Sequence, residues 1–434
     1  MMRLNIQGGG MMLCLLHYIS LTSAFTLPPA TRQLRVVSNL RQTSSQLNAK
    51  SSSVSFSSPL LDEGYPPAVT EFKSNKLREK PLLVYLPGFD GSILAPFLQF
   101  PELGTEFDVK GMTVKMDDRS SVEELKNLVI SFIDEEIQYY KNDDEDKNAK
   151  SKQASSPFSF VPKMDKDTQR PVFIMGESFG GILALETSLA IKELNAKRPP
   201  KQRINLQLIT LINPATCYNE SNLAKLGPPL TEISPLLYPF QLLKLLPLFT
   251  DSYAVPQLLL TLQSKALPSI IDNEQREAYM GRTAFSLPKK LEFMPQKTLK
   301  WRLEEWLTKG CTSLSNREQD IANLDVPALI VAGEVDNTLP SVAEADRLSK
   351  LFKKSFVHIV DGAGHACTSG SRVDLTALIR GACPKLFDGG RTEMKPAARN
   401  GAGIYYGTEK RYDDANIGLM PTLYWSKENY QSIT

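Results

Sequence analysis

The pentapeptide at 176–180, Gly-Glu-Ser-Phe-Gly, has the residue types and spacing of a nucleophilic serine held in a tight turn. An apolar, strand-forming run leads into it over 170–175, and a helix-forming run with small residues follows over 181–186. A strand, turn and helix of this kind lift the serine hydroxyl above the sheet, and the flanking glycines let the two backbones pass closely. We therefore predict that Ser178 attacks the acyl carbon of an ester or thioester. An ordinary glycine-rich turn is the alternative interpretation.

A serine hydroxyl is a weak nucleophile at neutral pH and needs a neighbouring general base. The sequence contains three histidines. His17 lies near the N-terminus in a predicted leader, and His358 lies inside a predicted strand, where a histidine is usually structural. His365 follows the last predicted strand in the run Asp-Gly-Ala-Gly-His, where an imidazole can turn towards a nucleophile. We predict His365 as the base, with a structural loop histidine as the alternative.

The base needs a carboxylate that orients the imidazole and stabilises its protonated form. Two acidic residues, Glu334 and Asp336, directly follow a predicted core strand. We predict Asp336 as the acid; Glu334 is the alternative, and either could instead be a capping carboxylate. Asn213, which follows the preceding strand, is not acidic and removes the other common location of this group.

A tetrahedral oxyanion needs two backbone N–H donors. One is expected from Phe179, which directly follows the nucleophile. The other is expected from the loop at 87–91, Pro-Gly-Phe-Asp-Gly, which ends the first strong strand. Phe89 is the first choice for this donor and Asp90 the second, and a plain turn is the alternative interpretation of the loop.

The elements that position these residues alternate between strand and helix. Short apolar runs predict buried strands at 82–86, 107–114, 170–175, 206–212, 326–333 and 355–360. Helices are predicted after a capping box formed by Ser121 and Glu124, after the pentapeptide, and over 342–352 and 373–380. The predicted fold class is α/β, with a mostly parallel sheet, helices on both faces and an inserted helical cap.

Composition divides the chain further, and the main domain is predicted to span 62–383. Within it, the charged and Ser/Pro-rich run 141–169 is expected to be a disordered surface insertion. The segment 217–320 interrupts the alternation and contains a Leu- and Pro-rich stretch, which predicts the helical cap. Its apolar side chains either pack on the body or line a lipid pocket that touches a membrane surface. The tail at 384–434 has little periodicity and receives no assignment.

The N-terminus is predicted to be a two-part leader. Residues 1–25 resemble a signal segment, with a short apolar run, and residues 26–61 are Ser-, Thr- and Gln-rich and free of acidic residues, like a disordered transit peptide. The junction at 22–28, Thr-Ser-Ala-Phe-Thr-Leu-Pro, resembles the plastid presequences of algae with secondary plastids, which implies a plastid destination. A secretory signal followed by a disordered linker is the alternative.

Charge and cysteine content exclude some classes of function. Five of the 50 basic residues and none of the 48 acidic residues precede Asp62, so 45 basic and 48 acidic residues remain from there onward. A nucleic-acid-binding protein is therefore not indicated. The five cysteines are Cys14, Cys217, Cys311, Cys367 and Cys383. Their spacing favours reduced thiols over a disulfide framework or a metal site, and we expect no metal and no cofactor.

Residues 81–382 resemble the α/β-hydrolase superfamily, in which the catalytic residues also occur in the order serine, aspartate, histidine. More narrowly, they resemble the hydrolase half of the plastid phytyl ester synthase and diacylglycerol acyltransferase-like proteins of plants. The resemblance is carried by Leu-Leu-Val-Tyr-Leu-Pro-Gly-Phe-Asp-Gly-Ser at 82–92, Asp-Arg-Ser at 118–120, Gly-Glu-Ser-Phe-Gly-Gly at 176–181 and Ile-Asn-Pro-Ala-Thr at 212–216. Those plant proteins also carry a second, acyltransferase-type domain with a His-x-x-x-x-Asp pair, which this sequence lacks.

The resemblance implies an acyl-Ser178 intermediate formed from a lipid ester or an acyl-CoA. The acyl group would then pass to an alcohol such as phytol or diacylglycerol. Transfer to water by an esterase or lipase is the first alternative, and a catalytically inactive lipid-binding protein is the second. The resemblance also implies a plastid protein that contacts a membrane or lipid-droplet surface, such as a thylakoid or plastoglobule, from one side.

Overall fold

The computed structural model describes residues 53–62, 80–97, 99–148, 169–242, 248, 294–368, 373–384, 386–387 and 404–407. They belong to one compact unit, Ser52–Thr434. The predictions for the leader up to residue 52, for 149–168 of the insertion and for 243–247 and 249–293 of the cap fall outside the described residues.

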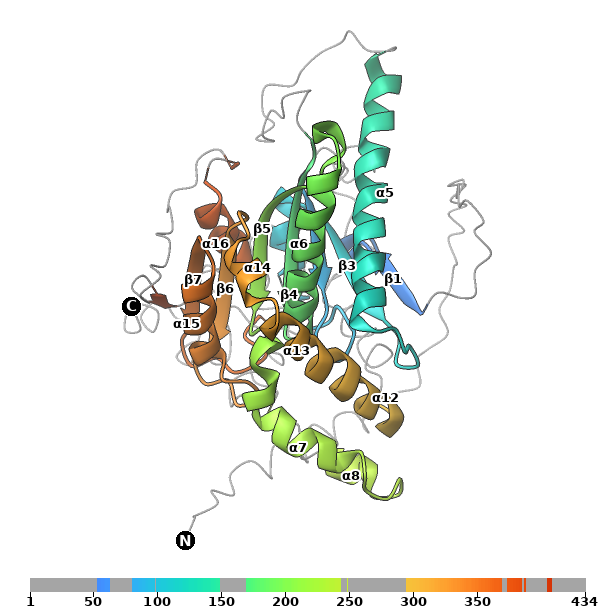
Figure 1. Cartoon of the computed structure of the whole chain (residues 1–434), viewed down its shortest axis with the longest axis vertical. Helices are drawn as coiled ribbons and strands as arrows, with labels where there is room; N and C mark the ends of the chain where they lie inside the picture. Colours follow the sequence, from blue (N-terminus) through green and yellow to red (C-terminus); the bar gives the residue numbers. More distant parts are fainter. Residues whose placement is uncertain are drawn as a thin grey trace, which may run out of the picture. The chain divides into compact units, whose positions relative to one another are not determined.

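An eight-stranded sheet forms the centre of this unit (Figure 1). Its strands are β1 (Val54–Ser57), β2 (Leu82–Leu86), β3 (Asp108–Val114), β4 (Pro171–Glu177), β5 (Asn205–Ile212), β6 (Ala328–Gly333), β7 (Ser355–Val360) and β8 (Ile404–Gly407). They lie side by side in the order β1-β3-β2-β4-β5-β6-β7-β8. All neighbours are parallel except β1, which runs antiparallel to β3. The carboxyl ends of seven strands therefore point to one edge of the sheet.

Helices cover both faces of this sheet (Figure 1). In β2, Leu82, Val84 and Leu86 pack on one face, Leu83 and Tyr85 pack on the other, and all five side chains are fully buried. The first face meets α5 (Val122–Asn148), α6 (Phe179–Lys197), α13 (Lys309–Ser315) and α15 (Ser341–Leu351). The second face meets α2 (Pro59–Asp62), α4 (Phe100–Glu106) and α16 (Leu375–Ala382). A strand buried on both faces is apolar throughout, which is why the sequence identifies these strands.

The helix predicted after Ser121 begins as expected. Glu124 Oε2 accepts a hydrogen bond from the Ser121 N–H at 2.7 Å, and Ser121 Oγ accepts one from the Glu124 N–H at 3.3 Å. This reciprocal pair satisfies two backbone donors that the first turn of a helix leaves without partners. The capping box is therefore confirmed.

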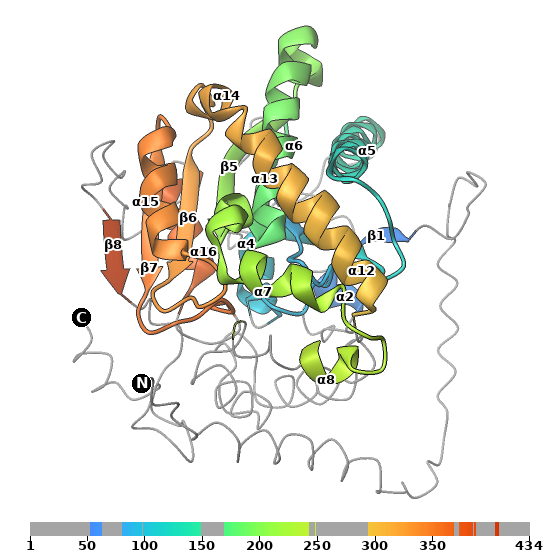
Figure 2. The same cartoon turned by 60° about the horizontal axis from the view of Figure 1, so that its bottom comes forward.

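Between β5 and β6 the chain leaves the sheet and forms helices. Those described are η3 (Ala215–Glu220), α7 (Asn222–Leu230), α8 (Tyr238–Leu242), α12 (Gln296–Trp301), η5 (Arg302–Thr308), α13 and α14 (Glu318–Ala322). A short turn of 3-10 helix, η2 (Pro200–Gln202), lies earlier, between α6 and β5. The continuous run α12-η5-α13 packs against α7 and α6 (Figure 2). The described parts of the segment predicted as a cap are thus helical.

The prediction that the leader is disordered up to residue 61 is wrong for its last part. Val54–Ser57 forms β1, with Val54 opposite Val114 of β3, and Ser53 donates a hydrogen bond to Asp118. The ring of Phe56 stacks on Phe132 of α5 at 4.1 Å between centroids. Serine-rich composition conceals this strand, because its stability comes from contacts with residues far along the chain.

Two other boundary predictions also change. Helix α5 continues to Asn148, so the first eight residues of the predicted disordered insertion are helical. Its Glu and Lys residues are compatible with helix, and they extend a helix that the capping box has already started. In the unassigned tail, Phe387 joins the core beside Phe107 and Phe173, and β8 pairs in parallel with β7.

The strand order and connections are those of the α/β-hydrolase fold. An antiparallel first strand borders a parallel sheet, and a tight turn joins the central strand β4 to α6. The predicted fold class is therefore confirmed, and the turn after β4 becomes the reference point for the site.

Candidate active site

Ser178 lies in a strained turn between β4 and α6. Its backbone has φ 55° and ψ −114°, a conformation that L-residues rarely adopt. The strand and helix approach so closely that a Cβ added to Gly176 would lie 2.0 Å from the Gly180 carbonyl oxygen. A Cβ on Gly180 would lie 2.1 Å from the Leu86 carbonyl oxygen. The two glycines thus permit the turn that holds the serine at the end of the sheet.

Asp336 and His365 come together after β6 and β7. Asp336 Oδ2 lies 2.8 Å from Nδ1 of His365. The other contacts of this carboxylate fix its orientation: it accepts from the Thr338 N–H at 2.8 Å and from the Ser341 hydroxyl at 2.5 Å. Glu334, the alternative acid, is exposed and instead accepts from the Gly362 N–H at 2.8 Å. The geometry therefore pairs the histidine with Asp336.

The two partners shift each other's proton affinity in opposite directions. Burial opposes ionisation of Asp336, but the charge and hydrogen bond of His365 outweigh it, so the pKa of this carboxyl lies below its ordinary value. Burial lowers the pKa of His365, yet the charge and hydrogen bond of Asp336, with the charge of Glu177, raise it above 6.5. A base must be neutral to accept a proton, so the predicted role of His365 as the base requires a pH above this raised pKa.

The segment that follows β5 ties the serine to the histidine. The Ser178 N–H donates to the Ile212 carbonyl and the Ser178 carbonyl accepts from the Ala215 N–H, both at 2.9 Å. Between these two anchors, Asn213 donates from Nδ2 to the His365 carbonyl at 2.6 Å. Asn213 also has a positive φ of 40°, which asparagine tolerates better than most residues. In the sequence, an asparagine directly after a core strand indicates only that no acid occupies this position.

The loop after β2 lies next to the serine. A Cβ added to Gly88 would lie 3.6 Å from Ser178 Cβ, and a turn closes where the Gly91 N–H donates to the Gly88 carbonyl at 3.0 Å. Among the residues that the structure describes, the backbone N–H groups of Phe89 and Phe179 have no hydrogen-bond acceptor. Two unengaged donors on the segments beside Ser178, the predicted nucleophile, suit a developing oxyanion. The choice between Phe89 and Asp90 stays a prediction.

Glu177 is a buried carboxyl next to the serine, and sequence reasoning assigned it no role. It accepts hydrogen bonds from the Tyr85 hydroxyl at 3.0 Å and from the Thr368 hydroxyl at 3.2 Å. Burial raises its pKa from 4.5 to about 7, although those hydrogen bonds and the charge of His365 act in the opposite direction. Its only sequence signal is an acidic residue at the variable position of the pentapeptide.

Replacing Glu177 with Gln should make stability less sensitive to pH. The folded protein retains a proton on Glu177 between about pH 4.5 and 7, where the unfolded chain releases it. The free energy of unfolding of the wild type therefore falls as pH rises through this window, and Glu177 accounts for about 3 kcal/mol of that fall. Urea unfolding at pH 5 and pH 8 measures the free energy of unfolding of both proteins. Relative to the wild type, the value for Glu177→Gln should be about 3 kcal/mol higher at pH 8 than at pH 5. If the free energies of unfolding of the variant and the wild type differ by the same amount at both pH values, the raised pKa of Glu177 is contradicted.

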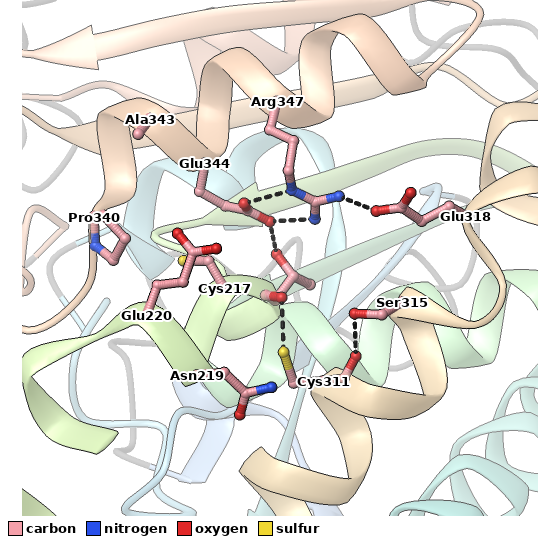
Figure 3. Close-up of a pocket in the computed structure, with 11 residues that line it drawn as sticks. Cys217, Asn219, Glu220, Cys311, Ser315, Glu318, Pro340, Ala343, Glu344 and Arg347 are labelled. Carbon is pink, nitrogen blue, oxygen red and sulfur yellow. Dashed lines mark hydrogen bonds and ion pairs between the residues drawn. The ribbon is translucent and has the colours of Figure 1, made fainter. Parts of the chain in front are cut away.

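A polar cavity of about 220 Å³ lies beside η3, α13 and α15 (Figure 3). Its charged lining is largely self-paired: Glu344 bonds Arg347 at 2.7 Å, and Arg347 bonds Glu318 at 2.5 Å. None of the three predicted catalytic residues lines it. We therefore do not assign this cavity to the acyl chain.

In the described part of the chain, no set of three or more His, Cys, Asp or Glu side chains is arranged to hold a metal ion. No helix in the same residues has the length and apolar character needed to cross a bilayer.

Comparison with known proteins identifies two curated relatives, although no family model matches the chain. Phytyl ester synthase 1, chloroplastic, of Arabidopsis thaliana is 26% identical over 313 residues, which cover 70% of this chain and 37% of the relative. Phytyl ester synthase 2, chloroplastic, of the same plant is 26% identical over 368 residues, which cover 80% of this chain and 41% of the relative. The chain thus spans about two fifths of the length of these relatives.

Solved structures also match the chain. MenH from S. aureus has a TM-score of 0.42 and 16% identity, covering 70% of this chain and 94% of that chain. The meta-cleavage product hydrolase CumD has a TM-score of 0.43 and 16% identity, covering 71% of this chain and 91% of that chain. The observed topology shows the α/β-hydrolase fold. Over the matched residues, the chain is similar to the two phytyl ester synthases.

Proposed function

We propose that this enzyme moves an acyl group from a lipid ester or thioester onto Ser178 and then to an alcohol such as phytol or diacylglycerol. The observation that carries the proposal is the 2.8 Å hydrogen bond between Asp336 and His365. It forms at the sheet edge where the turn after β4 presents Ser178. Asp336 would hold the imidazole in position and stabilise it when it is protonated.

The proposed reaction has two halves. His365 takes the Ser178 hydroxyl proton as the serine oxygen attacks the acyl carbon, and the carbonyl oxygen becomes an oxyanion held by the N–H groups of Phe179 and Phe89. The intermediate then expels the alcohol or thiol of the donor, which takes the proton from His365. In the second half, His365 removes a proton from the acceptor alcohol as it attacks the acyl-Ser178 ester. The Ser178 oxygen then leaves and takes that proton from His365, which restores the free serine.

The names of the two relatives, both phytyl ester synthases, support an alcohol as the acceptor. Hydrolysis by an esterase or lipase is the second candidate, because the same serine, histidine and aspartate would serve water equally well. Exclusion of water from the site would favour the alcohol. The two reactions share the acyl-Ser178 intermediate and differ only in what resolves it.

A lipid substrate is supported by exposed apolar side chains on the helices between β5 and β6. Leu226 of α7 and Phe240 of α8 are exposed, as are Leu236 and Leu237 just before α8, and Leu236 retains 84% of its accessible surface. Exposed apolar groups gathered in this way commonly mark a surface for lipid or protein. We propose that these four residues contact the membrane or lipid droplet that holds the substrate. Flotation with liposomes tests this contact, because a variant with serine at all four positions should float less than the wild type.

The two relatives are named chloroplastic, which supports a plastid location for this chain. The acid-free composition of residues 1–61 supports the same location. Association with a thylakoid or plastoglobule surface is part of this proposal. A fluorescent protein fused to the C-terminus of the full chain should co-localise with chlorophyll, and secretion of the fusion would contradict it.

The experiment that tests the function compares the full chain with its Ser178→Ala variant. Each is incubated with labelled galactolipid or acyl-CoA in the presence of phytol or diacylglycerol, and the lipid products are separated. Phytyl esters or triacylglycerol made only by the wild type would support acyl transfer. Free fatty acid alone would support the esterase or lipase. No Ser178-dependent product from either donor, with no labelling of Ser178 by a fluorophosphonate, would indicate an inactive lipid-binding protein.

A further inference from the structure

A π-helical turn, η5, packs against the site from the helical segment between β5 and β6. Its wide spacing is seen where the Lys309 N–H donates to the Glu304 carbonyl and where the Thr308 hydroxyl donates to the Leu303 carbonyl at 2.9 Å. π-helical turns are rare, and they frequently occur at functional sites. This one joins α12 to α13 within a single helical run (Figure 2).

Arg302, the first residue of η5, holds the loop that carries one predicted oxyanion donor. The side chain is fully buried, and Nη1 donates to the Phe89 carbonyl at 2.8 Å. Nη2 donates to the Lys115 carbonyl at 2.9 Å and to the Val114 carbonyl at 3.3 Å. One guanidinium therefore bridges the loop after β2 and the end of β3.

The backbone of Gly91 in this loop is closely packed beside the Arg302 guanidinium. A Cβ added to Gly91 would lie 2.5 Å from the Val114 carbonyl oxygen and 3.1 Å from Nη1 of Arg302. Gly91 has a positive φ of 74°, so the turn itself also requires glycine. The loop is thus confined by backbone on one side and by Arg302 on the other.

Trp306, one turn further along η5, contacts the second predicted donor residue. Its ring stacks on the ring of Phe179 at 4.4 Å between centroids, with 13° between the planes. The Arg302 guanidinium lies 4.2 Å from the centre of the same indole. The indole N–H donates to the Ser120 carbonyl at 2.9 Å, and the side chain is fully buried. A continuous stack therefore connects the Phe89 carbonyl to the Phe179 side chain.

We propose that Arg302 and Trp306 are positioning residues that set the separation between the N–H groups of Phe89 and Phe179. This inference rests on the proposed function, because it assumes that these two groups bind the oxyanion. Donors stabilise an oxyanion well only when they are already in place before the charge develops. A small displacement of such groups lowers the rate by about 100-fold. Lysine cannot replace Arg302, since it lacks the planar fork that reaches two elements at once.

The test uses the full chain and its Arg302→Lys and Trp306→Phe variants. Hydrolysis of p-nitrophenyl octanoate gives kcat and KM, and a long-chain alkyl trifluoromethyl ketone, which forms a tetrahedral adduct with an active serine, gives an inhibition constant. We expect Arg302→Lys to lower kcat by about 100-fold and to weaken the inhibitor by a similar factor, with KM changed by less than about 3-fold. Trp306→Phe, which keeps an aromatic ring, should lower kcat by about 10-fold.

Arg170 supplies a matched control. It is as fully buried as Arg302 and donates to Asp108 at 2.7 Å and to the Lys80 carbonyl at 3.0 Å, at the opposite edge of the sheet. Arg170→Lys should lower the melting temperature while keeping kcat within about 3-fold of wild type, because it is remote from the oxyanion. Equal kcat and inhibitor affinity in folded Arg302→Lys and Arg170→Lys would overturn the inference.

The remaining outcomes are also decisive. If Arg302→Lys does not fold, Trp306→Phe carries the test, and unchanged kcat and inhibitor affinity in that variant overturn the inference. If the wild type hydrolyses the ester with Ser178 but the variants match it, only the positioning role fails. If the wild type shows no Ser178-dependent release of p-nitrophenol, either in water alone or with an acceptor alcohol present, the proposed function fails and the positioning role fails with it.

Discussion

Replacing His365 with alanine should lower the rate of Ser178 acylation by about 10⁴- to 10⁶-fold. The serine hydroxyl keeps its strained position at the end of β4 in this variant, but nothing removes its proton as it attacks. Asp336→Asn should cost about 10⁴-fold, because the amide no longer stabilises the protonated imidazole. Single-turnover release of p-nitrophenol from a p-nitrophenyl ester measures both rates.

His358 offers the control for this experiment. It is a buried histidine within β7, away from the sheet edge that carries His365. His358→Gln should destabilise the fold, yet its folded fraction should acylate within about 3-fold of the wild-type rate. If His365→Ala acylates as fast as His358→Gln, then His365 is not the base.

Gly180→Ala should lower the free energy of unfolding by about 3 kcal/mol or more. The added Cβ would lie 2.1 Å from the Leu86 carbonyl oxygen and 2.8 Å from the Pro87 carbonyl oxygen. Both contacts are with backbone, which cannot move without separating α6 from β2. Urea unfolding followed by circular dichroism measures the loss, and the residual folded protein should also have lost acylation because the turn that carries Ser178 is displaced.

Gly227→Ala is the matched control for crowding by one methyl group. The added Cβ would lie 3.0 Å from a terminal methyl of Leu303 and 3.6 Å from one of Leu223, both of which can move. Gly227 lies in α7, where alanine also favours the helix by up to about 1 kcal/mol. Its stability should stay within about 1 kcal/mol of wild type. Equal destabilisation of both variants would contradict the close strand–helix approach at Gly180.

The parts of the fold that sequence predicts are those whose signal is local. Core strands such as β2 are apolar on both faces, and the capping box before α5 identifies a helix start from two residues. Ser178, Asp336 and His365 each follow a core strand, so their positions follow from the parallel arrangement of the sheet. The pairing of His365 with Asp336 instead of Glu334 required the structure, because both carboxylates follow the same strand.

What sequence does not predict depends on contacts between distant residues. Strand β1 has only four residues and forms because β3 and Phe132 offer partners. Arg302 and Trp306 lie in a stretch with ordinary helical character, and only the structure shows that one contacts the loop after β2 and the other the start of α6. Glu177 and Asn213 also depend on distant partners, which are Tyr85 of β2 for Glu177 and His365, after β7, for Asn213.

The acyl-enzyme itself is the most direct test of this account. The full chain is mixed with a labelled acyl donor, quenched in acid within one turnover, and analysed by intact mass and peptide mapping. We predict one added acyl group on the peptide that contains Ser178, absent from Ser178→Ala and removed faster when the acceptor alcohol is present. Acylation of a different residue, or full turnover by Ser178→Ala, would contradict the account.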